Sequence, residues 1–273
     1  MLRKLLKHEY IATARVMLPI YVAVLVLALA MRLTGGVWNA GGFSYSGMGR
    51  IGAVVTVLVI MGFFVGIVAA FVASFVQTIG RFRSNLLGDE GYVMFTLPVS
   101  THQLVWAKLI VSVTWFVGAV LLSILAFTIV AADASTFASG FHAFFLEFDD
   151  EIAPLSRGHM AAFAIECVLA LLLGCANVCL AFYAPLAIGH SFAKRKMLLS
   201  VVFFFVIQIV TDVLFNVLGF AATGIDRPAL FAGLSSPAAM HALMWVLILG
   251  LVLYGAVLYC LTIRMLHRHL DLE

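Results

Sequence analysis

Six long apolar runs, separated by short polar segments, dominate this chain of 273 residues. In order, they are Val16–Met31, Ile51–Ile79, Leu104–Ala131, Met160–Ile188, Leu198–Ala222 and His241–Ile263. A helix needs about 20 mainly apolar residues to cross the hydrocarbon core of a bilayer. Five of the runs reach that length, and the first does so with a few flanking residues. The pattern predicts an all-α membrane protein with six transmembrane helices.

The composition leads to the same class of protein. Hydrophobic residues make up 64% of the chain and charged residues 11%, whereas a soluble domain carries about 25% charged residues. Lipid must therefore solvate most side chains. No polar segment is long enough for a second folded domain, so we expect residues 1–273 to form a single transmembrane domain. The net charge is only +3, and we expect no nucleic-acid partner.

The distribution of basic residues predicts the orientation. With both termini in the cytoplasm, twelve of the 16 Lys and Arg residues fall on the cytoplasmic side. The four on the other side are Arg32, Arg50, Arg157 and Arg227. Because cytoplasmic loops carry an excess of Lys and Arg, we expect both termini inside and a multi-pass protein of the plasma (cytoplasmic) membrane.

Residues 1–15, MLRKLLKHEYIATAR, have an amphipathic pattern of their own. Leu2, Leu5 and Leu6 fall on one helical face, and Arg3 and Lys4 lie mostly away from it. The pattern predicts an interfacial helix that contacts membrane lipid before the chain enters the bilayer. It equally fits an ordinary basic flank that sets topology.

The second apolar run carries small residues at four-residue spacing: Gly62, Gly66, Ala70 and Ser74. Such a face lets another helix approach closely. It predicts tight helix packing, either within the subunit or across a dimer.

A polar segment, Arg81 to Lys108, separates the second run from the third. Asp89 and Glu90 lie between two glycines, and large apolar side chains follow although the segment is too short to cross a membrane. Pro98 disfavours a helix at the residue before it. Ser100 and Gln103 have the spacing of a capping box and predict the start of the third helix. The composition alone fits a loop that covers its own bundle as well as a docking surface for a cytoplasmic partner.

The string LLGDEGYVMFTLPVSTHQLVWAKL resembles the stretch that follows the second spanning helix in ABC transporter permeases of the type-2 class. The matching residues are Glu90, Gly91, Tyr92, Thr96, Leu97, Pro98, Val99, Ser100, Leu104, Lys108 and Leu109. The opening of the chain is similar to the N-terminus of that family through Leu5, Leu6, Lys7, His8, Glu9, Tyr10, Arg15, Leu18 and Pro19. The second half of the chain has no motif that matches residue by residue.

The resemblance implies an exporter-like permease subunit, from a bacterial membrane, that works with a separate ATPase. Residues 81–103 would contain a cytoplasmic coupling helix between helices 2 and 3, and residues 1–15 would be the elbow helix. The docking residues it implies are Asp89, Glu90, Gly91, Tyr92, Phe95, Leu97 and Pro98. ATP and Mg would bind to the ATPase, and the permease would pair with a second copy or a paralogue.

The sequence contains no phosphate-binding GxxxxGK[ST] motif, and no HExxH or GxSxG motif. We therefore expect the chain not to be an enzyme itself, to have no catalytic residues and to hold no cofactor. All four cysteines lie inside apolar runs. Since no ligand-type residue accompanies them at metal-binding spacing, we expect no metal site.

Two carboxylates fall inside predicted spans, Glu166 and Asp212. Ionisable groups within a membrane are costly and are functional candidates. We expect Glu166 near the outer interface, paired with Arg157 or Arg227 or facing water. Gln208 and Asn216 share a helix face with Asp212, so the three form a polar stripe that suits part of a substrate path or a seam between subunits.

Two other functions fit the same pattern. An ion-coupled secondary transporter would use Glu166 and Asp212 and would not need ATP. A membrane immunity or sensor subunit would bind a partner without transport. The sequence does not identify a substrate.

Overall fold

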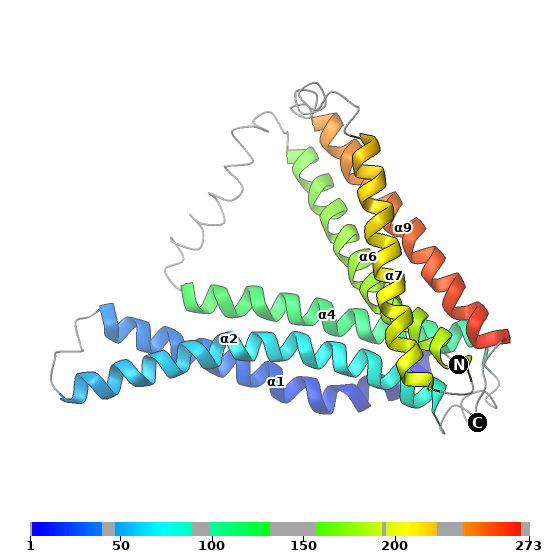
Figure 1. The fold of residues 1–273 in the computed structure, drawn as a ribbon. Coiled ribbons are helices and arrows are strands. Elements are labelled where there is room, and N and C mark those ends of the chain that lie inside the picture. The colour runs from blue at the N-terminus through cyan, green and yellow to red at the C-terminus, as the bar shows by residue number, and fades with distance from the viewer. Residues whose placement is uncertain are drawn as a thin grey trace. The chain divides into compact units, whose positions relative to one another are not determined.

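The structure is a computed structural model, and it describes residues 2–39, 47–88, 99–131, 157–192, 195–222 and 237–268. These residues form α1 (Leu2–Asn39), α2 (Gly47–Phe82), the π-helical turn η1 (Arg83–Leu87), α4 (Thr101–Ala131), α6 (Arg157–Gly189), α7 (Lys196–Ala222) and α9 (Pro237–Arg268) (Figure 1). Six of these helices are long and apolar enough to cross a membrane. The prediction of an all-helical, multi-pass membrane protein is confirmed.

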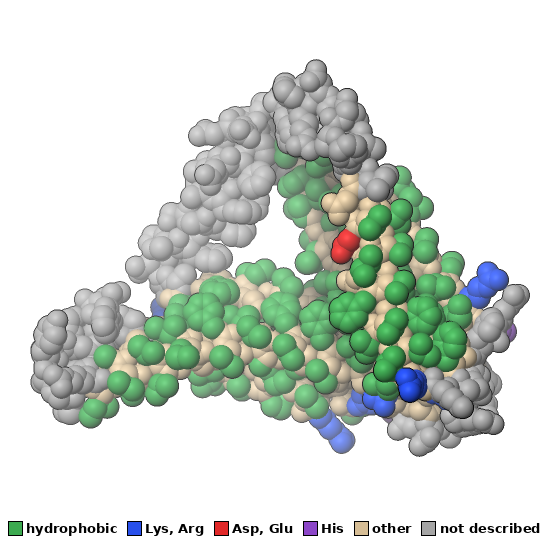
Figure 2. All heavy atoms as spheres, in the orientation of Figure 1, with side chains coloured by type: hydrophobic (Ala, Val, Ile, Leu, Met, Phe, Trp, Pro, Cys, Tyr) green, Lys and Arg blue, Asp and Glu red, His purple; other side chains and the backbone are tan. Residues whose placement is uncertain are grey.

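The helices carry hydrophobic side chains on their outer surfaces. Val68, Ile209 and Leu253, from three different helices, are each 60% exposed. Figure 2 shows hydrophobic side chains over the helices, with few charged groups among them. Water cannot solvate such a surface favourably, whereas lipid can.

Helix α1 is continuous from Leu2 to Asn39 and contains Pro19. The boundary predicted after residue 15 is therefore not a break in the helix. The first residues form an extension of the spanning helix, and their location at the lipid interface stays a prediction.

The chain divides into two compact units, which we describe separately. One contains Leu6–Gln77 and Thr114–Glu147, and we call it the α1–α2–α4 unit. The other contains Met1–Leu5, Thr78–Val113 and Phe148–Glu273, and we call it the α6–α7–α9 unit.

Helix α1 packs on the small-residue face of α2 in the α1–α2–α4 unit. A methyl group added at Gly66 would lie 3.2 Å from Val24, and one at Gly62 would lie 3.5 Å from Leu27. Further along α2, Ala70 and Ser74 are each 1% exposed. The core is completed by buried apolar side chains from all three helices, namely Val24, Ala28, Phe63, Ala70, Leu122 and Ala126. The small-residue face thus packs within the chain.

Polar contacts join α1 to α4 in the same unit. The Tyr21 hydroxyl donates to the backbone carbonyl of Trp115 at 2.8 Å, and the Trp115 indole N–H donates to Thr13 Oγ1 at 2.8 Å. The two rings also meet edge to face. In lipid, each of these groups needs a partner inside the protein, so the contacts fix how α4 lies on α1.

Helix α6 packs against both α7 and α9 in the α6–α7–α9 unit, where the three run side by side (Figure 1). Phe182 of α6 stacks on Phe204 of α7, with ring centroids 5.0 Å apart. Asn177 of α6 donates from Nδ2 to the carbonyl of Leu251 in α9 at 2.9 Å. Helix α6 is therefore the common partner through which the other two helices are held.

Candidate functional site

The seven docking residues predicted from the sequence lie outside the described residues. They are Asp89, Glu90, Gly91, Tyr92, Phe95, Leu97 and Pro98. Both flanks of their segment are described, and both belong to the α6–α7–α9 unit. The packing of the two flanks shows which helices hold the ends of the segment.

The flank before the segment is the end of α2 and the turn η1. Phe82 and Leu86 are fully buried, and Asn85 is 6% exposed. Arg83 is exposed. The apolar side chains of this turn point into the unit while its arginine stays at the surface, which anchors the chain immediately before the predicted docking segment.

The flank after the segment is the first half of α4. The backbone N–H of Gln103 donates to Ser100 Oγ at 3.3 Å, and the N–H of Leu104 donates to the Ser100 carbonyl at 3.2 Å. Ser100 thus satisfies orphan donors of the first turn, and the predicted helix start is confirmed. Leu104 and Val105 are buried, and Lys108 is only 4% exposed.

One residue of α6, Tyr183, contacts both flanks. Its ring stacks on Phe82, with centroids 4.1 Å apart and planes 11° apart. Its hydroxyl lies 3.0 Å from Ser112 Oγ of α4. Tyr183 is fully buried, so water does not compete for either contact. We call this arrangement of Phe82, Tyr183 and Ser112 the Tyr183 clamp.

The end of α6 lies very close to the start of α7. A side chain at Gly189 would overlap the backbone N and Cα of Ser200. The next residue, His190, is 6% exposed, and its Nδ1–H donates to the Leu186 carbonyl at 2.9 Å. Burial lowers the pKa of His190, and the positive charges of Arg83 and Lys196 lower it further, although the bond to Leu186 opposes the shift.

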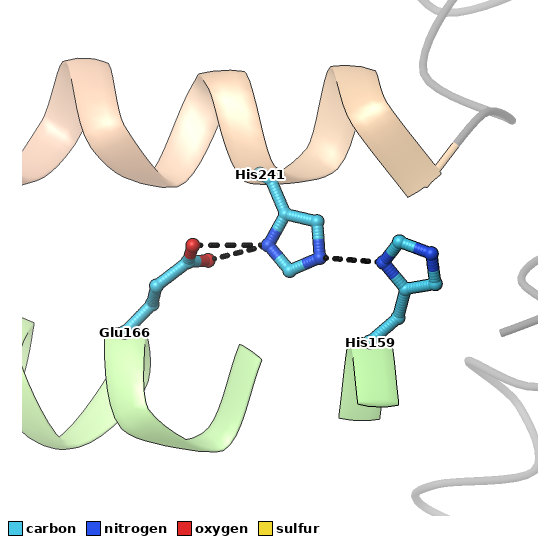
Figure 3. Close-up of polar contacts among 3 residues, drawn as sticks. All are labelled: His159, Glu166 and His241. Atoms are coloured by element: carbon cyan, nitrogen blue, oxygen red, sulfur yellow. Dashed lines mark hydrogen bonds and ion pairs between the residues drawn. The ribbon is translucent and has the colours of Figure 1, made fainter. Parts of the chain in front are cut away.

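A second polar group lies at the opposite end of α6 (Figure 3). Nδ1 of His241 in α9 is 3.0 Å and 2.9 Å from the two carboxylate oxygens of Glu166. The other ring nitrogen of His241, Nε2, is 3.3 Å from Nδ1 of His159. We call these three residues the Glu166–His241–His159 row.

The sequence predicted that Glu166 pairs with Arg157 or Arg227 or faces water, and within the described side chains its partner is His241. The Arg157 side chain and all of Arg227 lie outside the described side chains. The sequence did contain a signal for the row: His159 and Glu166 are two helical turns apart and share a face, and His241 opens the last apolar run. That signal was missed because no sequence rule indicates which helices are neighbours.

The other members of the predicted polar path lie elsewhere. Gln208, Asp212 and Asn216 are all exposed on α7. Asn216 donates from Nδ2 to the backbone carbonyl of Asp212 at 2.7 Å. The hydrogen-bond partner of Glu166 in the described chain is His241 of α9, and a polar path that Glu166 shares with this stripe stays a prediction.

Within the described part of the chain, no group of three or more His, Cys, Asp or Glu side chains is arranged to hold a metal ion. No protein-family model matches the chain, and no curated protein or solved structure matches it significantly.

Proposed function

We propose that this chain is the membrane permease subunit of an ATP-driven ABC exporter in the plasma membrane of a bacterium. The six membrane-length helices supply the transmembrane part. Residues 81–103 would dock on a separate ATPase subunit, which would bind ATP and Mg. The resemblance of this segment to type-2 permeases motivates the assignment.

The observation that carries the proposal is the Tyr183 clamp. A docking segment can transmit force only if both of its ends are fixed to a helix that moves. Phe82 precedes the segment and Ser112 follows it, and both contact Tyr183. A displacement of the segment would therefore reach α6 through both flanks, by ring stacking on one side and by a hydrogen bond on the other.

Helix α6 would distribute this motion because α7 and α9 both pack against it. The close approach at Gly189 and Ser200 leaves no space to absorb a shift locally. Packed interiors are stiff and pass small shifts on to their neighbours. The expected result is a joint movement of α6, α7 and α9 that opens or closes a path for the substrate.

The exposed stripe of Gln208, Asp212 and Asn216 fits this scheme. A charged side chain that faces lipid is costly, so the stripe is better placed at a seam with a second permease copy or a paralogue, or along the substrate path. Substitution of Asp212 by Asn tests this role. If transport, ATPase stimulation and assembly were all unchanged, the stripe would have no such role.

The principal experiment replaces residues 89–98 with a Gly/Ser linker of equal length. We expect loss of co-purification with the partner ATPase, and loss of ATPase stimulation. The thermal stability of the permease should change little because the anchors on both sides are retained. A matched control replaces residues 225–234, between α7 and α9, with the same linker. Full ATPase association of the 89–98 variant would disprove the docking role.

A further inference from the structure

The Glu166–His241–His159 row runs from an exposed position into the contact between α6 and α9. His159 is exposed, whereas the side chains of His241 and Glu166 are 18% and 9% exposed. Each member lies within hydrogen-bonding distance of the next. The row therefore joins the surface to a half-buried histidine and a buried carboxylate (Figure 3).

We propose that His241 is a proton-binding site that is loaded through His159 and whose proton is retained by Glu166. Chains of glutamate and histidine within a membrane protein are typical of proton relays. The inference is independent of the ATPase-coupled function proposed above, because it concerns the other end of α6 and needs no partner protein.

The hydrogen-bond directions determine the starting state. A carboxylate only accepts hydrogen bonds, so His241 donates to Glu166 from Nδ1–H. In the neutral imidazole, the lone pair of Nε2 is then free to accept. His159 must donate to it from Nδ1–H, which leaves its own Nε2 unprotonated. His159 is the most exposed residue of the row and precedes the membrane-length segment Ala161–Gly189, so we place the entry point of the proton there.

Proton uptake then follows in two coupled steps. A proton from water forms a bond to His159 Nε2, and the Nδ1–H bond of His159 breaks as that proton moves to His241 Nε2. His159 ends neutral, with its proton on the other nitrogen. His241 ends as an imidazolium facing Glu166. One proton has entered and one positive charge has appeared, on His241.

Few other groups compete for the proton. Of the titratable side chains in the described part of the chain, those that contact His241 are Glu166 and His159, both from α6. The rings of Phe163 of α6 and His241 meet edge to face, with centroids 6.4 Å apart. Cys167, beside Glu166, is exposed. The described part of α7 contributes no titratable contact to the row.

The proton would also change the contact between the two helices. Before uptake a neutral imidazole donates to the carboxylate, and after uptake the two groups carry opposite charges, which adds an electrostatic attraction to the hydrogen bond. The partly buried position limits screening by salt. Proton binding should therefore hold the N-terminal ends of α6 and α9 together, and proton release should loosen them.

The test is a pH titration of histidine-labelled protein in lipid nanodiscs, followed by ¹⁵N NMR. The His241 signals are assigned by their loss in His241→Gln. We expect His241 to gain a second N–H as the pH of the sample is lowered. In Glu166→Gln, which keeps the size of the side chain, we expect a smaller protonated fraction of His241 at each pH.

The relay is tested by His159→Ala, since removal of an exposed side chain should not disturb helix packing. We expect proton exchange at His241 to slow by at least about tenfold, because a positioned acid–base group typically contributes 10²–10⁴-fold. His267→Ala, at the other end of α9, should change nothing. A His241 that stays neutral throughout the titration, or exchanges at the same rate without His159, would overturn the proposal and leave a structural hydrogen bond only.

Discussion

The two ends of helix α6 are held by different kinds of contact. At the Tyr183 end, a buried aromatic ring stacks on Phe82 and a hydroxyl pairs with a hydroxyl, and these two contacts join uncharged groups. At the Glu166 end, a carboxylate and two imidazoles form a row whose first member, His159, is exposed. Neutral packed contacts are insensitive to pH and salt, whereas ionisable ones respond to both. The first end suits transmission of movement, and the second suits binding of an ion.

The strongest test of this contrast is Gly189→Ala. Its methyl group would overlap the Ser200 backbone, which cannot rotate away. Overpacking typically costs about 1–3 kcal/mol, and we expect a loss near the upper limit in the free energy of unfolding in detergent. Gly174→Ala on the same helix is the matched control, since nothing lies within 4 Å of its added methyl group. It should stabilise by up to about 1 kcal/mol through helix propensity. Equal stability of the two variants would show that α6 and α7 are not in close contact here.

A smaller effect is expected from Tyr183→Phe, which keeps the stack on Phe82 and removes the hydroxyl. We expect a loss of about 0.5–1.5 kcal/mol, the usual net value of a hydrogen bond. Ser112→Ala should cost a similar amount, and the double variant should cost less than the sum because the two hydroxyls share one interaction. Thermal unfolding of the four proteins gives the coupling energy. Strict additivity would mean that the hydroxyls do not interact, and the clamp would then depend on stacking alone.

The same contrast explains how much could be predicted from sequence. Helix number and the Ser100 helix start depend on local pattern and local capping, and both were predicted correctly. The Tyr183 clamp depends on residues separated by 71 positions, and nothing local to Phe82, Ser112 or Tyr183 indicates that they meet. Glu166 was recognised as a candidate because a charge within a span is unusual. Its partner His241 was not recognised, since the packing of the whole unit determines which helices are neighbours.

A histidine at the Tyr183 end, His190, qualifies the comparison. Burial lowers its pKa, and Arg83 and Lys196 add to the shift. In the unfolded chain, a histidine titrates near pH 6.5. As the pH falls below that value, His190 becomes protonated in the unfolded state while it is still neutral in the folded state. The stability contributed by neutral His190 is therefore present above about pH 6.5 and is lost as the pH falls toward the lower folded-state pKa.

We expect this loss to be the smallest of the three effects. One proton limits the slope to about 1.4 kcal/mol per pH unit. The measurement is thermal unfolding in detergent between about pH 8 and pH 5, compared with His190→Gln, which keeps a donor for the Leu186 carbonyl. The variant should show a flatter pH dependence, whereas the exposed His267→Gln should follow the unsubstituted protein. If His190→Gln kept the same slope, the response would belong to another group. The Glu166–His241–His159 row can be separated from it by sign, because protonation of His241 strengthens its contact with Glu166, whereas protonation of His190 places a charge in a buried position near Arg83 and Lys196.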